Sequence, residues 1–74
     1  MKVRNLNANT TEITTDRATI LFSYGVPVAA CMEDGSGFIR TATNYSRTTS
    51  KHINAWLHGA KAREVPQTEL DSLA

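Results

Sequence analysis

Few side chains in this 74-residue chain could do chemistry: one cysteine, two histidines and scattered serines. Cys31, Ser46 and Ser50 would each need a neighbouring base and an oxyanion-stabilising loop to act as nucleophiles, and neither is recognisable in the sequence. His52 and His58 are six residues apart, so on one helix they point about 120° apart, which is poor geometry for sharing a metal. The sequence therefore predicts no enzymatic activity, no metal site and no cofactor.

The segment DGSG, at 34–37, superficially resembles a phosphate-binding loop, but it lacks the spacing and the lysine of a P-loop. Glycine reaches positive φ at little cost, so this segment predicts a hairpin turn instead. A single cysteine cannot form an internal disulfide, and we expect Cys31 to be a small buried hydrophobic residue in a strand.

Three short segments rich in β-forming residues, at 18–24, 26–34 and 38–45, predict strands joined by turns. A helix should follow, with Thr48, Thr49 and Ser50 as alternative N-caps and Gly59 as its C-terminal stop. Its residues Ile53, Trp56 and Leu57 form one apolar stripe about 100° wide, which can cover a sheet.

A second, short helix is expected after Pro66, with Leu70 and Leu73 facing inward. The predicted fold is α+β: a three-stranded antiparallel sheet packed by one α-helix, with a short C-terminal helix and a disordered N-terminal arm. Residues 1–12 would be the flexible basic arm and residues 13–74 a single small domain. If both faces of the sheet are apolar, the second needs the C-terminal helix, a dimer mate or a target protein to cover it.

The charges are unevenly distributed along the chain although the net charge is only +1. From Gly35 to Arg63 there are five lysines or arginines, two histidines and no carboxylate, whereas residues 64–74 hold three acids and no base. A basic surface would attract nucleic acid or an acidic protein face, but five cations could also point in different directions around so small a domain. No basic cluster typical of dedicated nucleic-acid domains is present.

The aromatic residues allow two interpretations. Trp56, the only tryptophan, is expected to anchor the helix on the sheet. Tyr24, Phe38 and Tyr45 could instead form a stacking platform for single-stranded bases, although no RNP-type motif supports this.

Three segments, MKVRNLN, YGVPVAA and YSRTTSKHINAWL, together resemble a group of small proteins encoded by tailed bacteriophages. The size, the basic arm and the overall layout are also similar to those of the phage-encoded transcription regulators that bind host RNA polymerase. The resemblance implies a host-takeover factor in the host bacterial cytoplasm that acts by protein–protein interaction. It would bind the β′ N-terminal region and the β flap, inhibit σ-dependent initiation and allow antitermination.

On this resemblance the arm orders on the polymerase, and alternating cationic and apolar residues suit the addition of a strand to a sheet edge. The implied partner-binding residues are Lys2, Val3, Arg4, Asn5 and Leu6. Arg47 and Lys51 would lie near nucleic acid within the complex. We expect a monomer and, because no apolar run is long enough to span a bilayer, no membrane partner. The alternatives are a phage counter-defence inhibitor and a small nucleic-acid-binding module.

Overall fold

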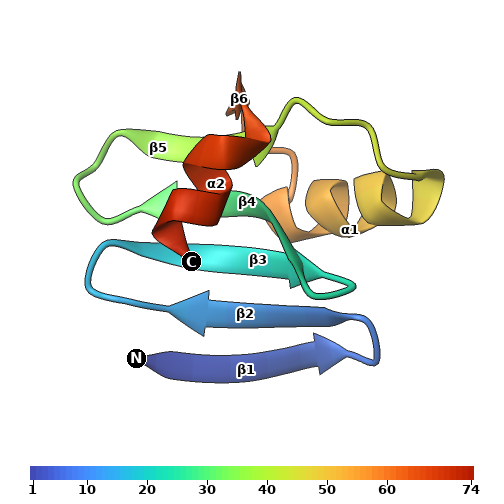
Figure 1. The fold of residues 1–74 in the computed structure, drawn as a ribbon, viewed down its shortest axis with the longest axis horizontal. Coiled ribbons are helices and arrows are strands. Elements are labelled where there is room, and N and C mark those ends of the chain that lie inside the picture. Colours follow the sequence, from blue (N-terminus) through green and yellow to red (C-terminus); the bar gives the residue numbers. More distant parts are fainter.

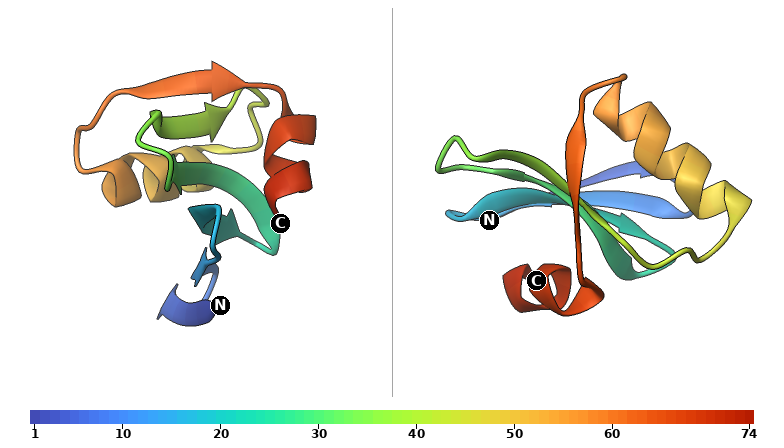
Figure 2. Two further views of the ribbon diagram at one scale, coloured as in Figure 1. Left: turned by 90° about the vertical axis from the view of Figure 1, so that its left-hand side faces the viewer. Right: turned by 90° about the horizontal axis from the view of Figure 1, so that it is seen from above.

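Six strands form one mixed sheet in the order β1-β2-β3-β4-β5-β6, and one helix lies on each of its faces (Figures 1 and 2). The computed structural model describes all 74 residues. The strands are β1 (Lys2–Asn7), β2 (Thr10–Thr14), β3 (Ala18–Ser23), β4 (Val26–Met32), β5 (Gly37–Thr41) and β6 (Ala62–Val65). The helices are α1 (Arg47–Leu57) and α2 (Gln67–Leu73).

The expected three-stranded sheet with a disordered N-terminal arm is wrong. Strands β3, β4 and β5 lie where the sequence predicts them, but β1 and β2 form an additional antiparallel hairpin in the segment expected to be disordered. Their Asn- and Thr-rich sequence conceals this hairpin, because β1 buries none of its side chains and so lacks the apolar alternation of a half-buried strand. The short β6, which contributes only Val65 to the buried core, was hidden for the same reason.

Strands β1 to β5 form an antiparallel meander, and β6 then pairs with β5 in parallel after the crossover through α1. The N-cap of α1 is Ser46, earlier than any of the predicted caps: its hydroxyl oxygen accepts a hydrogen bond of 3.1 Å from the backbone N–H of Thr49. The helix ends at Leu57, and His58 takes the left-handed conformation at φ 51° just before Gly59.

A β-bulge in β4 explains why the sequence could not assign the apolar residues to faces. Leu21 pairs with Ala29 but Phe22 pairs with Pro27, so Val28 is an extra residue in β4. Both Val28 and Ala29 therefore pack with Leu21 on the side of α1, although adjacent residues of a regular strand point to opposite faces.

The sheet lies between the two helices (Figure 2), and one buried cluster lies on each of its faces. On the first face, Ile53 and Leu57 of α1 cover Leu21, Val28 and Ala29. On the second, α2 covers the sheet through its fully buried Leu70, with Leu73 packed at the border. The buried residues beneath α2 are Ala18, Ile20, Ala30, Ile39 and Val65.

The C-terminal helix is thus the element that covers the second apolar face. Each helix covers the centre of the sheet, while β1 lies at its edge and contributes to neither buried cluster (Figure 1). Neither helix is long and apolar enough to cross a membrane.

Candidate functional site

The predicted partner-binding residues, Lys2 to Leu6, all lie in β1, at the free edge of the sheet. All six residues of β1 are exposed, and the strand pairs with β2 on one side only. Along its other side the backbone N–H and C=O groups that do not point to β2 have no strand partner, which is the arrangement that accepts an added strand.

The side chains of β1 alternate between the two faces of the sheet. Arg4 and Leu6 point to the side of α1, where Arg4 Nη2 lies 3.1 Å from Glu12 Oε2 on β2. Val3, the residue before Arg4, points to the opposite face and is 61% exposed. The same Glu12 oxygen accepts a hydrogen bond of 2.9 Å from Trp56 Nε1, so one carboxylate links β1 and β2 to α1.

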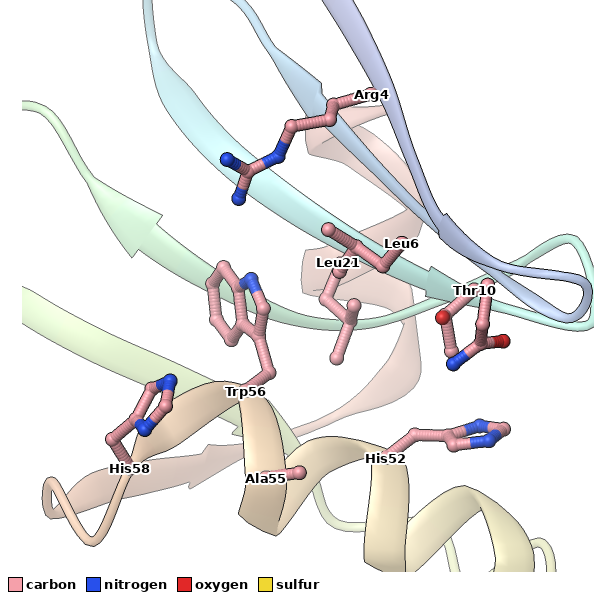
Figure 3. A pocket seen from close by; sticks show the side chains of 9 residues that line it. Arg4, Leu6, Thr10, Leu21, His52, Ala55, Trp56 and His58 are labelled. Carbon is pink, nitrogen blue, oxygen red and sulfur yellow. The ribbon is translucent and has the colours of Figure 1, made fainter.

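A pocket of about 240 Å³ lies between the first three strands and α1 (Figure 3). The strands supply apolar Leu6 and Leu21, and α1 supplies Ala55 and Trp56. The polar side chains in the lining are Arg4, Asn7, Thr10, His52 and His58. The pocket exists because α1 covers the centre of the sheet and leaves the same face of β1 and β2 open.

The Thr10 hydroxyl in this pocket has no hydrogen-bond partner. Thr10 is only 3% exposed, and its Oγ1 is the one buried side-chain oxygen or nitrogen of the molecule that is unpaired. Leaving a buried hydroxyl without a partner costs about 1–3 kcal/mol, so this group calls for an explanation.

A chain of hydroxyls links the N-cap of α1 to His52. Ser46 Oγ donates to Thr49 Oγ1 at 3.3 Å, Thr49 Oγ1 lies 3.4 Å from Ser23 Oγ, and Ser23 Oγ lies 3.0 Å from His52 Nδ1. Either hydroxyl can donate in the contact between Thr49 and Ser23, and the role of Nδ1 depends on the tautomer of the imidazole. In the neutral tautomer that accepts from Ser23 at Nδ1, the proton is on Nε2 and His52 is a hydrogen-bond donor through that atom.

The two residues expected near nucleic acid, Arg47 and Lys51, are exposed on the first turns of α1, four residues apart. They therefore share one face of the helix. The remaining cations of the acid-free stretch do not all join them. Arg40 Nη1 donates a hydrogen bond of 3.3 Å to Asn54 Oδ1 of α1, whereas Arg63 lies near Glu69 of the acidic helix α2 on the other face.

The aromatic platform considered from the sequence is not formed as a unit. Phe38 packs edge-on against Trp56 beneath α1, with ring centroids 6.0 Å apart. Tyr24 and Tyr45 border a different pocket, at the other end of the helix, and both are exposed.

The other groups singled out in the sequence are not assembled into a reactive centre. Cys31 is half-buried in β4, paired with Phe38 and Thr19, rather than fully buried as expected. No three His, Cys, Asp or Glu side chains come close enough to hold one metal ion. In the 34–37 turn, hydrogen bonds from the Ser36 hydroxyl and, to a smaller extent, from the Ser36 backbone N–H lower the pKa of the exposed Asp34 carboxyl. The loop is therefore itself an anion.

Thr10 and Glu12 are the residues of this region that the sequence prediction misses, because it places both in the disordered arm of residues 1–12. The signal that could have found them is the run TTEITT at 10–15, in which β-branched residues surround a single acid. In the strand it forms, Thr10 and Glu12 share the face that looks toward α1.

Comparison with known proteins adds a family but no activity. No curated protein and no solved structure shows significant similarity to the chain. Residues 1–72 match a family described as a family of unknown function, DUF8033. Because the match spans nearly the entire chain, the protein belongs to the DUF8033 family.

Proposed function

We propose that the protein is a phage host-takeover factor that works by docking on bacterial RNA polymerase through β1. It binds the β′ N-terminal region and the β flap, blocks σ-dependent promoter initiation and favours antitermination. The choice of polymerase as the partner rests on the resemblance of the sequence to phage transcription regulators. The observation that carries the docking mode is β1 itself, a complete strand at the sheet edge with every residue exposed.

An edge strand of this kind has a physical tendency to bind another strand. Its unpaired backbone groups are a template for main-chain hydrogen bonds, and proteins normally shield such edges. Here the strand contributes no residue to either buried cluster, so its side chains can be selected for a partner rather than for packing in the core. Lys2 and Arg4 add positive charge, which favours an acidic partner strand.

The same charges disfavour a second copy of the chain as the partner. In an antiparallel pair of β1 strands centred on Arg4, the two Arg4 side chains would face each other directly, and like charges at opposite positions destabilise a sheet. A monomer that binds an acidic partner is therefore the favoured arrangement.

A secondary contact with nucleic acid is supported by Arg47 and Lys51. Both are exposed on one face of α1, where no acid stands within the helix to neutralise them. Within the complex they would reach RNA or upstream DNA and add a salt-dependent term to binding. The alternative in which this face alone makes the protein an independent nucleic-acid-binding module predicts binding to free RNA or DNA.

The test is capture of purified bacterial core RNA polymerase, followed by transcription from a σ-dependent promoter. Deletion of residues 1–6 should abolish capture and inhibition while a cooperative melting transition is retained, because β1 lies outside both buried clusters. The matched control is the double variant Arg47→Glu, Lys51→Glu, which leaves β1 intact and should still bind core polymerase. Undiminished capture by the truncated protein would contradict docking through β1.

The same double variant tests the alternative. If the protein is an independent nucleic-acid binder, the wild type should shift free RNA or DNA in a gel, with an affinity that falls as salt rises, and the double variant should not. Absence of a shift at low salt would exclude that alternative.

A further inference from the structure

We propose that the pocket between the β1–β3 strands and α1 is a binding site for a small ligand that joins one ring-sized apolar group to a carboxylate or phosphate. This inference goes beyond docking on a protein and does not depend on it. The carrying observation is Thr10, whose side chain lines the pocket and whose buried hydroxyl has no hydrogen-bond partner.

The size of the pocket limits the ligand. At about 240 Å³ it lies just below the range of about 300–1,000 Å³ that holds drug-sized molecules. Water occupies about 30 Å³ per molecule in the liquid, so the pocket has room for roughly eight waters or a ligand with about ten non-hydrogen atoms. A single ring with one charged substituent has this size.

The polar end of the pocket is rich in donors. Thr10 pairs in register with Ser23, whose hydroxyl holds His52 Nδ1 at 3.0 Å, so Thr10 and His52 are close neighbours across β3 and α1. The Thr10 O–H is one donor, and His52 is a second in the tautomer that accepts from Ser23 at Nδ1 and carries its proton on Nε2. Asn7 pairs with Thr10 on β1 and brings its amide to the same end.

These donors favour an oxyanion over a neutral or cationic ligand. A carboxylate or phosphate offers acceptors to several donors at once, and hydrogen bonds to a charged acceptor are about twice as strong as neutral ones. The nearest acid, Glu12, lies two residues further along β2, and its Oε2 is already engaged by Arg4 and Trp56. The Arg4 cation and the Trp56 N–H therefore partly compensate the charge of Glu12, which reduces its repulsion of a bound anion.

The remainder of the pocket suits a flat apolar group. Leu6 and Leu21 on the sheet side and Trp56 on the helix side border its apolar part (Figure 3). Removing a ring from water against such surfaces supplies binding energy in proportion to the area buried, while the donor end sets its orientation.

The test uses benzoate and phenyl phosphate as probes of the two oxyanions, titrated into the full-length protein and followed by NMR. Either probe should shift the Trp56 indole N–H and the Thr10 amide saturably. Benzyl alcohol, which keeps the ring, and inorganic phosphate, which keeps the charge, should each bind at least about tenfold more weakly. Binding by only one oxyanion probe identifies which anion the site accepts. No saturable shift with either would overturn the proposal.

The variant Thr10→Val separates a binding role from a structural one. It should weaken the bound probe about tenfold or more, since one hydrogen bond to a charged group is lost. It should also leave the melting temperature unchanged or raise it, because a buried unpaired hydroxyl is removed. Thr11→Val, on the opposite face of β2, should affect neither binding nor the pocket.

A second variant, Ala55→Leu, fills the pocket from the exposed side of α1 without removing any contact and should abolish binding. Wild-type affinity in Thr10→Val or in Ala55→Leu would overturn the assignment of the site. A clear fall in the melting temperature of Thr10→Val would also count against it, since the hydroxyl would then have a structural partner.

Discussion

Replacing Glu12 should show how the β1–β2 hairpin is attached to the body of the protein. One oxygen, Oε2, takes a hydrogen bond of 2.9 Å from Trp56 Nε1 and an ion pair of 3.1 Å from Arg4. The Arg4 side chain is 69% exposed, whereas that of Glu12 is only 17% exposed. The two contacts of the same oxygen therefore lie in different environments and should differ in energy.

The hydrogen bond should dominate. In Glu12→Ala the half-buried indole N–H of Trp56 loses its acceptor, which costs about 1–3 kcal/mol. The exposed ion pair adds about 0–1 kcal/mol, and solvent screening of Arg4 places it near the lower value. A domain of this length has about 4–11 kcal/mol of stability, so Glu12→Ala should remove a substantial part of it.

Urea denaturation followed by the fluorescence of Trp56, the only tryptophan, measures this loss. Two matched variants divide it. Glu12→Gln keeps an amide oxygen that can accept from Trp56 and should cost less than about 1 kcal/mol, while Arg4→Met removes only the ion pair and should cost about 0–0.5 kcal/mol. A loss in Arg4→Met equal to that in Glu12→Ala would refute the reasoning, because the exposed ion pair would then be the main link.

Three further predictions test the packing and the caps. Leu70→Ala should cost about 2–5 kcal/mol in urea denaturation, since this fully buried side chain holds α2 on the second face, and a loss below about 1 kcal/mol would mean that α2 is not docked there. Ser46→Ala should cost about 1 kcal/mol through loss of the α1 N-cap, whereas Ser50→Ala, within the helix, should cost almost nothing; equal effects would disprove the cap assignment. Hydrogen bonds from Ser36 lower the pKa of Asp34 in the folded protein, so the stabilisation that they provide is present above the unfolded pKa and is lost as pH falls through the lower, folded value. In acid denaturation, Asp34→Asn should lack this pH-dependent part of the free energy of unfolding. An acid denaturation curve identical to that of the wild type would contradict this prediction.

The parts of the fold that follow from the sequence are those that bury apolar side chains in a regular period. The stripe of Ile53, Trp56 and Leu57 placed α1, and the pair Leu70 and Leu73 placed α2. The N-terminal hairpin and β6 could not be predicted this way, because periodicity reports burial and these strands bury few or no side chains. The bulge at Val28 could not be predicted from the sequence either, because it changes the face to which a residue points without changing the type of the residue.

The candidate site was predictable only in part, for a related reason. The basic residues of β1 are visible as a charged N-terminus whether or not it forms a strand. The pocket, in contrast, depends on the pairing of Thr10 with Ser23 and on the position of His52 above it, which are contacts between distant parts of the chain. No local sequence pattern encodes these contacts. Whether the Thr10 hydroxyl is buried and without a partner can be seen only once the residues around it are known.

The two proposals share β1, and they can nevertheless be tested separately. Deletion of residues 1–6 removes both the sheet edge and the pocket walls Arg4 and Leu6, so loss of polymerase capture in that variant does not say which of them acts. Thr10→Val changes only the pocket, because its side chain is buried behind β1 and the edge backbone is untouched. If docking uses the edge alone, Thr10→Val should bind polymerase normally while losing the small oxyanion ligand. If Thr10→Val loses both, the pocket takes part in recognising the protein, and an acidic residue of the partner becomes its natural occupant.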